Sequence, residues 1–266
     1  MTTIRSLQSL EGRAALVTGA AGRVGRATCE TLGELGAFVI GTDSDAAGLT
    51  ACIDNLSDLG YPASALPADL EDESAISALP SRVVDETGRL DVLVNCAALV
   101  GTTALAGWSV PFREQSAVAW RRALETNLTA VFLLAQASAE VLAASGRGIV
   151  VNIASIHAWL GPDLRLYEGT DMGHPAAYAA SKGGLVQLTR WLATVLAPRI
   201  RVNSISPGGI YDAQDPSFVA RYEARTPLGR MANVDDLRGA IAYLTSDLSA
   251  YVTGTDLRVD GGWSAW

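Results

Sequence analysis

Short apolar runs alternate along the chain with longer stretches in which apolar positions recur at helical spacing. The short runs lack the strict polar–apolar alternation of a half-buried sheet, which is typical of parallel strands covered on both faces. We therefore expect strands at residues 14–17, 38–40, 63–66, 92–94, 148–153, 201–205 and 257–259.

The amphipathic stretches predict the helices that connect these strands. Because right-handed strand–helix–strand units place helices on both faces of a sheet, we expect an α/β fold: a doubly wound Rossmann domain with a mainly parallel seven-stranded sheet. No internal repeat, low-complexity tract or linker is visible, so residues 1–266 should form a single domain. The expected helices run from a Gly-rich turn to about residue 36 and over 45–59, 71–86, 116–144, 176–196 and 234–246, with loops over 97–111 and, lid-like, 207–230.

Composition narrows the classes of partner. With 49% apolar and 18% charged residues the chain should fold into a globule, and a net charge of −8 disfavours nucleic acid and anionic membranes. The three cysteines match no metal spacing, so we expect reduced thiols and no metal site. No signal peptide and no run of about 18 apolar residues is visible. We expect a soluble cytoplasmic protein by default.

A Gly-rich turn, TGAAGRVG over residues 18–25, joins the first strand to the first helix. Its glycines allow a tight turn and let a phosphate approach backbone N–H groups at the positive end of a helix. A position after a strand and before a helix is the context that a phosphate-binding turn requires. A tight turn without a ligand is the alternative.

Asp43 ends the second strand, 18 residues after Gly25. A carboxylate there can accept hydrogen bonds from an adenosine ribose and would repel a 2′-phosphate, so it favours NAD over NADP. Two alternatives stay open: Asp43 can cap the next helix, and Arg23 can partner a 2′-phosphate.

Tyr178 and Lys182 are spaced i, i+4 on a predicted helix, so they share one face. A phenol with a pKa near ~10 is a poor base at neutral pH, but a nearby ammonium stabilises the phenolate and lowers that pKa. The pair can therefore exchange a proton with a substrate oxygen. Taken alone, this spacing is a weak signal.

Two further polar residues fit such a site. Ser155 follows the fifth predicted strand, at the carboxyl edge where doubly wound sheets bind ligands; the alternative is a serine that caps a turn. Asn127 lies inside the long predicted helix, where asparagine is unfavourable. Its place among apolar neighbours suggests a buried hydrogen-bonding role, with a kinked helix and a bound water as one possibility.

In their order along the chain these features resemble the short-chain dehydrogenase/reductase family, from about Leu10 to Trp263. Each motif is weak, but their joint order is specific. The matching features are the Gly-rich turn, Asp43, Asp69-Leu70, Asn95 to Ala98, Asn127, Ser155, Tyr178 and Lys182, Pro207-Gly208 and Asp260 to Gly262.

The resemblance implies a role for each catalytic candidate. Tyr178 would be the general acid/base, and Lys182 would bind the nicotinamide ribose and lower the tyrosine pKa. Ser155 would position the substrate oxygen, and Asn127 would hold a water in a proton relay. Residues implied to bind or flank the cofactor are Gly19, Arg23, Val24, Gly25, Asp43, Asp69, Leu70, Asn95, Ala97, Tyr178, Lys182, Pro207, Gly208 and Ile210.

Three departures from the family pattern concern the cofactor site. Arg23 stands where the middle glycine of the turn belongs, so the turn can be reshaped. Cys96 and Ala98 replace an asparagine and a glycine. Asp212 occupies a position where a threonine often contacts the nicotinamide amide.

The fourth departure is an insertion. Twenty-two residues separate Ser155 from Tyr178, about ten more than is usual in the family. With the segment 206–212 and the carboxyl end, the insertion resembles a subgroup of flagellin-modification and sugar-biosynthesis enzymes, which suggests a polyol, sugar or sugar-derived ketone as substrate. A surface loop that touches only a neighbouring subunit, and not the substrate, is an equal alternative. Insertion residues that can reach the substrate, although packing is the commoner role of each, are His157, Trp159, Arg165, Tyr167 and His174.

The leading functional hypothesis is reversible hydride transfer between NAD(H) and a secondary alcohol or ketone, with a small-molecule substrate. A non-enzymatic NAD-binding sensor on the same fold is the first alternative. An enzyme that epimerises or dehydrates its substrate with internally recycled NAD is the second. The resemblance also implies a homotetramer or homodimer built on the helices at 116–144 and 176–196.

Overall fold

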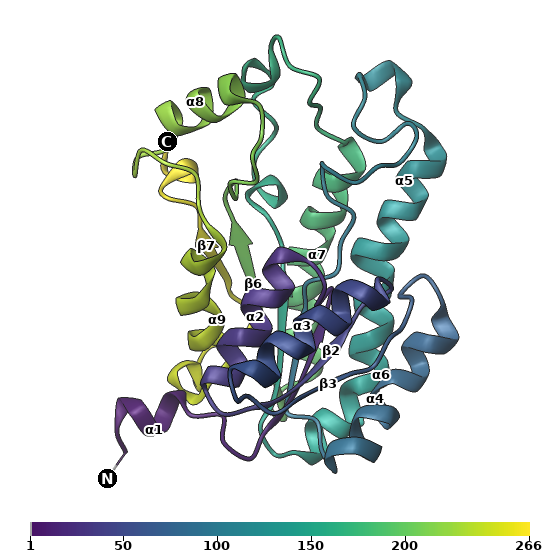
Figure 1. Cartoon of the computed structure of the whole chain (residues 1–266), viewed down its shortest axis with the longest axis vertical. Coiled ribbons are helices and arrows are strands. Elements are labelled where there is room, and N and C mark those ends of the chain that lie inside the picture. Colours follow the sequence, from purple (N-terminus) through teal and green to yellow (C-terminus); the bar gives the residue numbers. More distant parts are fainter. Residues whose placement is uncertain (1) are drawn as a thin grey trace.

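A computed structural model describes residues 2–266 of the chain. A parallel sheet of seven strands runs through its centre in the order β3-β2-β1-β4-β5-β6-β7 (Figure 1). All seven expected strands are present, and the doubly wound α/β fold is confirmed. The strands are β1 (Ala14–Thr18), β2 (Phe38–Thr42), β3 (Ala63–Ala65), β4 (Val92–Asn95), β5 (Gly148–Ile153), β6 (Ile200–Pro207) and β7 (Asp256–Val259).

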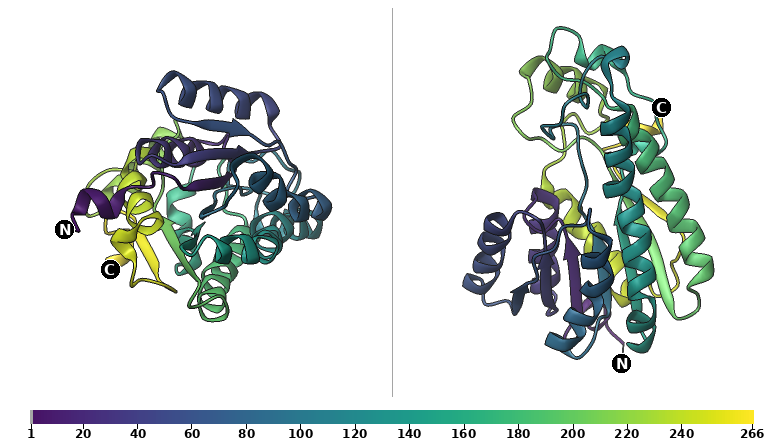
Figure 2. Two further views of the ribbon diagram at one scale, coloured as in Figure 1. Left: turned by 90° about the horizontal axis from the view of Figure 1, so that it is seen from below. Right: turned by 90° about the vertical axis from the view of Figure 1, so that its right-hand side faces the viewer.

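Helices cover both faces of the sheet (Figure 2). Successive residues of β1 point to opposite faces: Val17 joins the core beneath α2, α3 and α9, and Leu16 joins the core beneath α4, α6 and α7. The helices are α1 (Ile4–Gln8), α2 (Arg23–Glu34), α3 (Ala46–Asp58), α4 (Glu73–Thr87), α5 (Ala117–Leu124), α6 (Ala130–Ala144), α7 (Ala176–Val195), α8 (Pro216–Arg225) and α9 (Arg238–Thr245).

Two helices lie in segments for which no helix is predicted. The first is α1, whose N-cap Thr3 forms a capping box with Ser6. The second is α8, in the middle of the segment expected to be a lid-like loop. Asp215 caps α8 by accepting a hydrogen bond from the Ser217 N–H, and Pro216 supplies the first turn.

The long helix expected at 116–144 is not regular. A π turn, Glu125–Thr129, separates α5 from α6 and contains Asn127. π turns are rare and occur mostly as single turns inside α-helices, frequently at functional sites. The irregularity anticipated at Asn127 is therefore present, in the form of a wider turn.

The same stretch, Ala117–Ala144, is long and apolar enough to pass for a membrane span when only length and composition are considered. Part of this stretch packs on neighbouring elements, since α5 packs against α7, and α6 packs against α4 and β5, and 39% of the apolar window is buried. The absence of a membrane partner stays a prediction.

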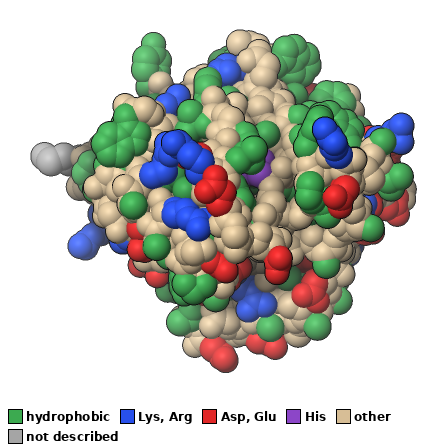
Figure 3. Space-filling model, turned by 90° about the horizontal axis from the view of Figure 1, so that it is seen from above, with side chains coloured by type: hydrophobic (Ala, Val, Ile, Leu, Met, Phe, Trp, Pro, Cys, Tyr) green, Lys and Arg blue, Asp and Glu red, His purple; other side chains and the backbone are tan. Residues whose placement is uncertain are grey.

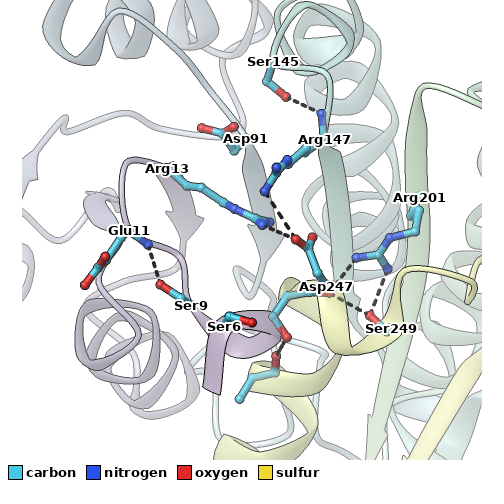
Figure 4. Close-up of polar contacts among 12 residues, drawn as sticks. Ser6, Ser9, Glu11, Arg13, Asp91, Ser145, Arg147, Arg201, Asp247 and Ser249 are labelled. Atoms are coloured by element: carbon cyan, nitrogen blue, oxygen red, sulfur yellow. Dashed lines mark hydrogen bonds and ion pairs between the residues drawn. The ribbon is translucent and has the colours of Figure 1, made fainter. Parts of the chain in front are cut away.

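Charged side chains gather at the amino ends of the strands (Figure 4). Asp247, after α9, accepts hydrogen bonds from Arg13 and Arg147 over 2.8 and 3.3 Å. Arg201 donates to the Ser249 hydroxyl over 3.0 Å and to nearby backbone carbonyls. This end of the sheet is held by ion pairs and hydrogen bonds between segments far apart in sequence.

Candidate active site

A cleft of about 1050 Å³ opens at the carboxyl ends of the strands. The Gly-rich turn, the segments that follow β2, β4, β5 and β6, and the insertion before α7 form its walls. Open α/β sheets bind ligands at this edge. Every residue predicted to bind the cofactor lines the cleft except Asn95, and so do three of the four catalytic candidates; Asn127 lies behind the wall.

The Gly-rich turn keeps a close backbone approach despite Arg23. Gly19 has φ +67°, and a Cβ placed on it would come within 2.7 Å of Ala97; a Cβ on Gly25 would clash with the backbone of Gly19. Gly22, the N-cap of α2, offers no side-chain acceptor to the first N–H groups of that twelve-residue helix. These donors face the cleft, which suits the pyrophosphate of a dinucleotide.

Arg23 leaves the turn and crosses to the segment after β6. Its Nη2 donates to the Tyr211 carbonyl over 2.6 Å, and its Nη1 lies 2.9 Å from Asp212 Oδ1. Two of the departures from the family pattern are therefore partners of each other. The ion pair is half-exposed, so its contribution to stability is small, about 0–1 kcal/mol.

Asp43 lies just past the end of β2, on the side of the Gly-rich turn opposite to the segment that Arg23 contacts. Its carboxylate accepts hydrogen bonds from the Ala21 and Asp45 N–H groups, both over 3.0 Å, and it lines the cleft. Asp45, not Asp43, caps α3 by accepting from the Gly48 N–H. The helix-cap alternative for Asp43 is wrong.

The other cofactor candidates lie in the same wall or just behind it. Asp69 accepts a hydrogen bond from the Glu71 N–H, and Leu70 packs on the core beneath α4. Asn95 is buried and donates to Asn152 over 2.8 Å, which ties β4 to β5. Asn95 therefore positions the strand. Like Asp69 and Leu70, the remaining candidates line the cleft directly: Val24, Ala97, Pro207, Gly208 and Ile210.

Tyr178 and Lys182 lie together on α7 at the floor of the cleft. Lys182 Nζ is 5.8 Å from the centroid of the Tyr178 ring and donates to the Ile153 carbonyl over 2.7 Å. Burial lowers the pKa of Lys182 to about 8. Burial also raises the pKa of Tyr178, and a hydrogen bond with Ser155 works in the opposite direction.

Ser155 is both a cap and a member of the site. Its hydroxyl accepts a hydrogen bond from the His157 N–H over 3.2 Å at the start of a short 3₁₀ turn, Ile156–Ala158. The same hydroxyl lies beside Tyr178 in the cleft. The capping alternative and the functional interpretation therefore describe the same side chain.

Asn127 supports the cleft from behind. Its Oδ1 accepts from the Leu99 N–H over 2.7 Å, and its Nδ2 donates to the Leu99 carbonyl and to the Ser181 hydroxyl, each over 3.1 Å. These bonds connect the π turn to the loop after β4 and to α7. The role of Asn127 in holding a water stays a prediction.

Of the five insertion residues predicted to be able to reach the substrate, three line the cleft. His157, Tyr167 and His174 line the cleft around Tyr178. Trp159 does not line it: it packs on Arg190 and Arg258. Arg165 does not line the cleft either; it pairs with Asp163, which does. The alternative of an insertion without contact to the cleft is wrong.

One wall of the cleft was not anticipated from the sequence. Phe218 and Tyr222 of α8 pack with Leu166 and Met231, and Trp263 stacks on Tyr222 with 4.2 Å between ring centroids. The Asp215-Pro216 start signal could have revealed α8. The docking of α8 onto the insertion is a long-range contact without a local sequence signal.

Known proteins resemble this chain over nearly its whole length. The family profile described as enoyl-(acyl carrier protein) reductase matches residues 19–264. A cis-4-hydroxycyclohexanecarboxylate dehydrogenase from Sinomonas cyclohexanicum is 36% identical over 258 residues, covering 95% of this chain and 97% of the relative. A D-threitol dehydrogenase from Mycolicibacterium smegmatis is 33% identical, covering 96% and 94%.

A solved structure extends the likeness to three dimensions. A protein from Beutenbergia cavernae, assigned as an NAD(P)-dependent gluconate 5-dehydrogenase and holding NADP at low occupancy, superimposes with a TM-score of 0.84. It is 35% identical and covers 98% of this chain and 100% of that chain. None of these names comes from flagellin modification, so the narrower resemblance has no support.

All three named relatives are dehydrogenases, which removes the support for a non-enzymatic sensor. The order of the motifs, the Tyr178–Lys182 pair in the cleft and the full-length matches agree. The chain belongs to the short-chain dehydrogenase/reductase family and is an NAD(P)-dependent oxidoreductase that acts on alcohols or ketones.

Proposed function

We propose that this enzyme interconverts a secondary alcohol of the polyol or sugar type with its ketone, using NAD(H). The observation that carries the proposal is the meeting of Tyr178, Lys182 and Ser155 at the floor of the cleft, beside the Gly-rich turn. Bound nicotinamide would accept or supply the hydride. The D-threitol dehydrogenase shows that a relative of this length acts on a polyol.

The protein side of the reaction is proton transfer and positioning. Tyr178 would take the alcohol proton during oxidation and return it during reduction. Lys182, as a cation, would stabilise the phenolate. Ser155 would hold the reacting oxygen next to Tyr178, and Asn127 would keep the π turn and the loop after β4 in register. Because burial raises the pKa of Tyr178, oxidation should accelerate as the pH rises.

The preference for NAD rests on Asp43 and on the position of Arg23. β2, which ends at Asp43, and β6, which precedes Asp212, lie on opposite sides of β1. Arg23 is directed to the β6 side and is already paired there. The Arg23 guanidinium therefore lies on the opposite side from the Asp43 carboxylate, where a 2′-phosphate would bind. That separation supports the earlier preference for Asp43 over Arg23.

We also propose that the enzyme is a homotetramer or homodimer. Large apolar side chains are exposed on the two helices that the family uses for assembly: Val118 and Trp120 on α5, and Trp191 and Val195 on α7. Exposed apolar groups that cluster on neighbouring helices are typical of protein interfaces. Light scattering coupled to size exclusion would give the mass in solution. A monomer at micromolar concentration would contradict this assembly.

The test of the proposed function follows NADH absorbance with NAD+ or NADP+ and a panel of polyols, sugars and simple secondary alcohols. Turnover with NAD+ should fall by about 10²- to 10⁴-fold in Tyr178→Phe protein. Tyr167→Phe, a second tyrosine that lines the same cleft, is the matched control and should retain proton transfer. Turnover that survives Tyr178→Phe would contradict the assignment, and cofactor that stays bound without net turnover would favour internal redox epimerisation or dehydration.

A further inference from the structure

The only two histidines of the chain lie side by side at the floor of the cleft. The ring centroids of His157 and His174 are 4.1 Å apart, and they lie 6.4 and 6.1 Å from the centroid of the Tyr178 ring. They come from the two ends of the insertion. Figure 3 shows a histidine side chain in the hollow at the centre of this face, between apolar groups.

One nitrogen of each imidazole lacks a hydrogen-bond partner. His157 Nδ1 and His174 Nε2 are buried and have no hydrogen-bond partner, whereas the His157 ring also lies within hydrogen-bonding reach of the Leu160 backbone. An unpaired buried polar atom costs about 1–3 kcal/mol. Side chains that served only to pack this wall would avoid that cost as apolar residues. The arrangement therefore points to a ligand that supplies the missing partners.

The two rings are neutral hydrogen-bonding groups at physiological pH. Burial lowers the pKa of His157, and burial together with the nearby His157 lowers the pKa of His174 to about 4. A neutral imidazole carries one donor and one acceptor. The titratable groups that face the pair are Tyr167, whose pKa burial raises to about 12, and Tyr178. The wall around the reacting oxygen therefore carries hydrogen-bonding groups without charge.

The cationic side chains that line the cleft are already engaged. Arg225 pairs with Asp163, Arg122 with Glu71, and Arg23 with Asp212, and Lys182 donates to a backbone carbonyl. A carboxylate, a phosphate or an acyl carrier would find no free cation among the described residues of the cleft. This favours a neutral, hydroxylated substrate over an anionic one.

We propose that His157 and His174 form a specificity site for a second substrate oxygen, a hydroxyl on the carbon next to the one that is oxidised. The substrate class is then a neutral vicinal diol, or the α-hydroxy ketone that it forms. The inference rests on the proposed function, since Tyr178 holds the first oxygen. One of these two nitrogens donates to the second oxygen and the other accepts from it, so an alcohol without that hydroxyl leaves both nitrogens unpaired.

The test compares butane-2,3-diol, in each stereoisomer, with butan-2-ol, which differs by one hydroxyl. We expect the kcat/KM of the preferred diol to exceed that of butan-2-ol at least tenfold. In His157→Phe and His174→Phe enzymes, which keep a flat ring but no hydrogen bond, this ratio should fall toward one through loss of diol activity. His174→Gln should restore part of it. Trp159→Phe, in the same insertion but outside the cleft, should leave the ratio unchanged. An unchanged ratio in both Phe variants would overturn the inference.

A binding measurement separates this inference from the proposed function. Because the chain has only two histidines, ¹⁵N-histidine labelling of tag-free protein reports on these rings alone. In Tyr178→Phe enzyme saturated with NAD+, butane-2,3-diol should shift the ring ¹⁵N signals more than butan-2-ol does. If wild-type enzyme oxidises neither alcohol, the proposed function fails for this class while the ¹⁵N shifts still decide the diol site. Signals that stay unmoved at saturating diol would overturn the site itself.

Discussion

The two ends of the sheet use buried polar groups in opposite ways. At the amino ends of the strands, Arg13 pairs with Asp247, and Arg201 finds a hydroxyl and several carbonyls; one nitrogen of Arg13 is left unpaired. At the carboxyl ends, Lys182 has a single carbonyl partner, and each of two imidazoles has a buried nitrogen without one. The first arrangement stabilises the fold. The second leaves donors and acceptors for ligands and lowers stability, as expected at a functional site.

The largest expected effect that separates the two ends of the sheet comes from substituting Lys182. Replacing it with methionine should reduce turnover by at least 100-fold, since the phenolate of Tyr178 loses its cation. The folded protein should not be weakened at neutral pH, because the variant removes a buried ammonium that is 3% exposed. NADH formation measures the first effect, and urea unfolding measures the second.

The difference in stability between the wild-type and Lys182→Met proteins should depend on pH, in a direction that the pKa of Lys182 fixes. The pKa of Lys182 is about 8 when folded and 10.5 in its ordinary state, so between these values the unfolded chain binds a proton that the folded chain lacks. Wild-type stability should therefore rise across this window, by up to about 3 kcal/mol relative to Lys182→Met. Below pH 8 the desolvation cost is present in full. A flat difference between the two proteins from pH 7 to 10.5 would contradict the buried, destabilised ammonium.

Asp247→Ala should show the reverse pattern at the other end. It leaves Arg13, which is 5% exposed, as a buried charge without its partner, so the free energy of unfolding should fall by about 3 kcal/mol. Activity per folded molecule should not change, because Asp247 is remote from the cleft wall. Glu140→Ala, which removes an exposed and weak ion pair with Arg199, is the control. Equal losses of stability in both variants would remove the distinction between the two ends.

Asp43→Asn should alter cofactor choice and little else. Removing the negative charge that faces the adenosine end should reduce the preference for NAD+ over NADP+ about tenfold in kcat/KM, equivalent to about 1.4 kcal/mol. Asp45→Asn is the matched control, since Asp45 caps α3 and asparagine is an equally good cap. If the two variants shift the NAD+/NADP+ ratio equally, Asp43 has no special role.

The smallest expected effect concerns the ion pair between Arg23 and Asp212. A double-mutant cycle with Arg23→Ala and Asp212→Ala should give a coupling energy in NAD+ binding of about 0.2–1 kcal/mol. High salt should reduce that coupling, because both side chains are half-exposed. A coupling energy that stays constant as salt is raised would contradict a solvent-screened ion pair between Arg23 and Asp212.

The sequence was sufficient for the features that depend on local patterns. Buried strands such as 148–153 show as apolar runs, and the i, i+4 spacing of Tyr178 and Lys182 was retained by α7. It did not reveal that Arg23 and Asp212 meet, because that contact joins residues far apart in sequence. The pairing of His157 with His174 was missed for a related reason, since it depends on how the insertion folds back on itself.

The π turn at Glu125–Thr129 has a consequence for the long helix as a whole. A π turn adds one residue to an α-helix, and each residue corresponds to about 100° of rotation around the axis. The half before the turn can thus present its buried side to α7, while the half after it presents its own to α4. Deleting one residue here would restore a regular helix and rotate α5 relative to α6. Ala119 and Ala123 could then no longer face α7 while Leu134 and Leu142 remain in the core. The π turn thus sets the relative rotation of α5 and α6 about their common axis, so that each helix faces its own packing partner.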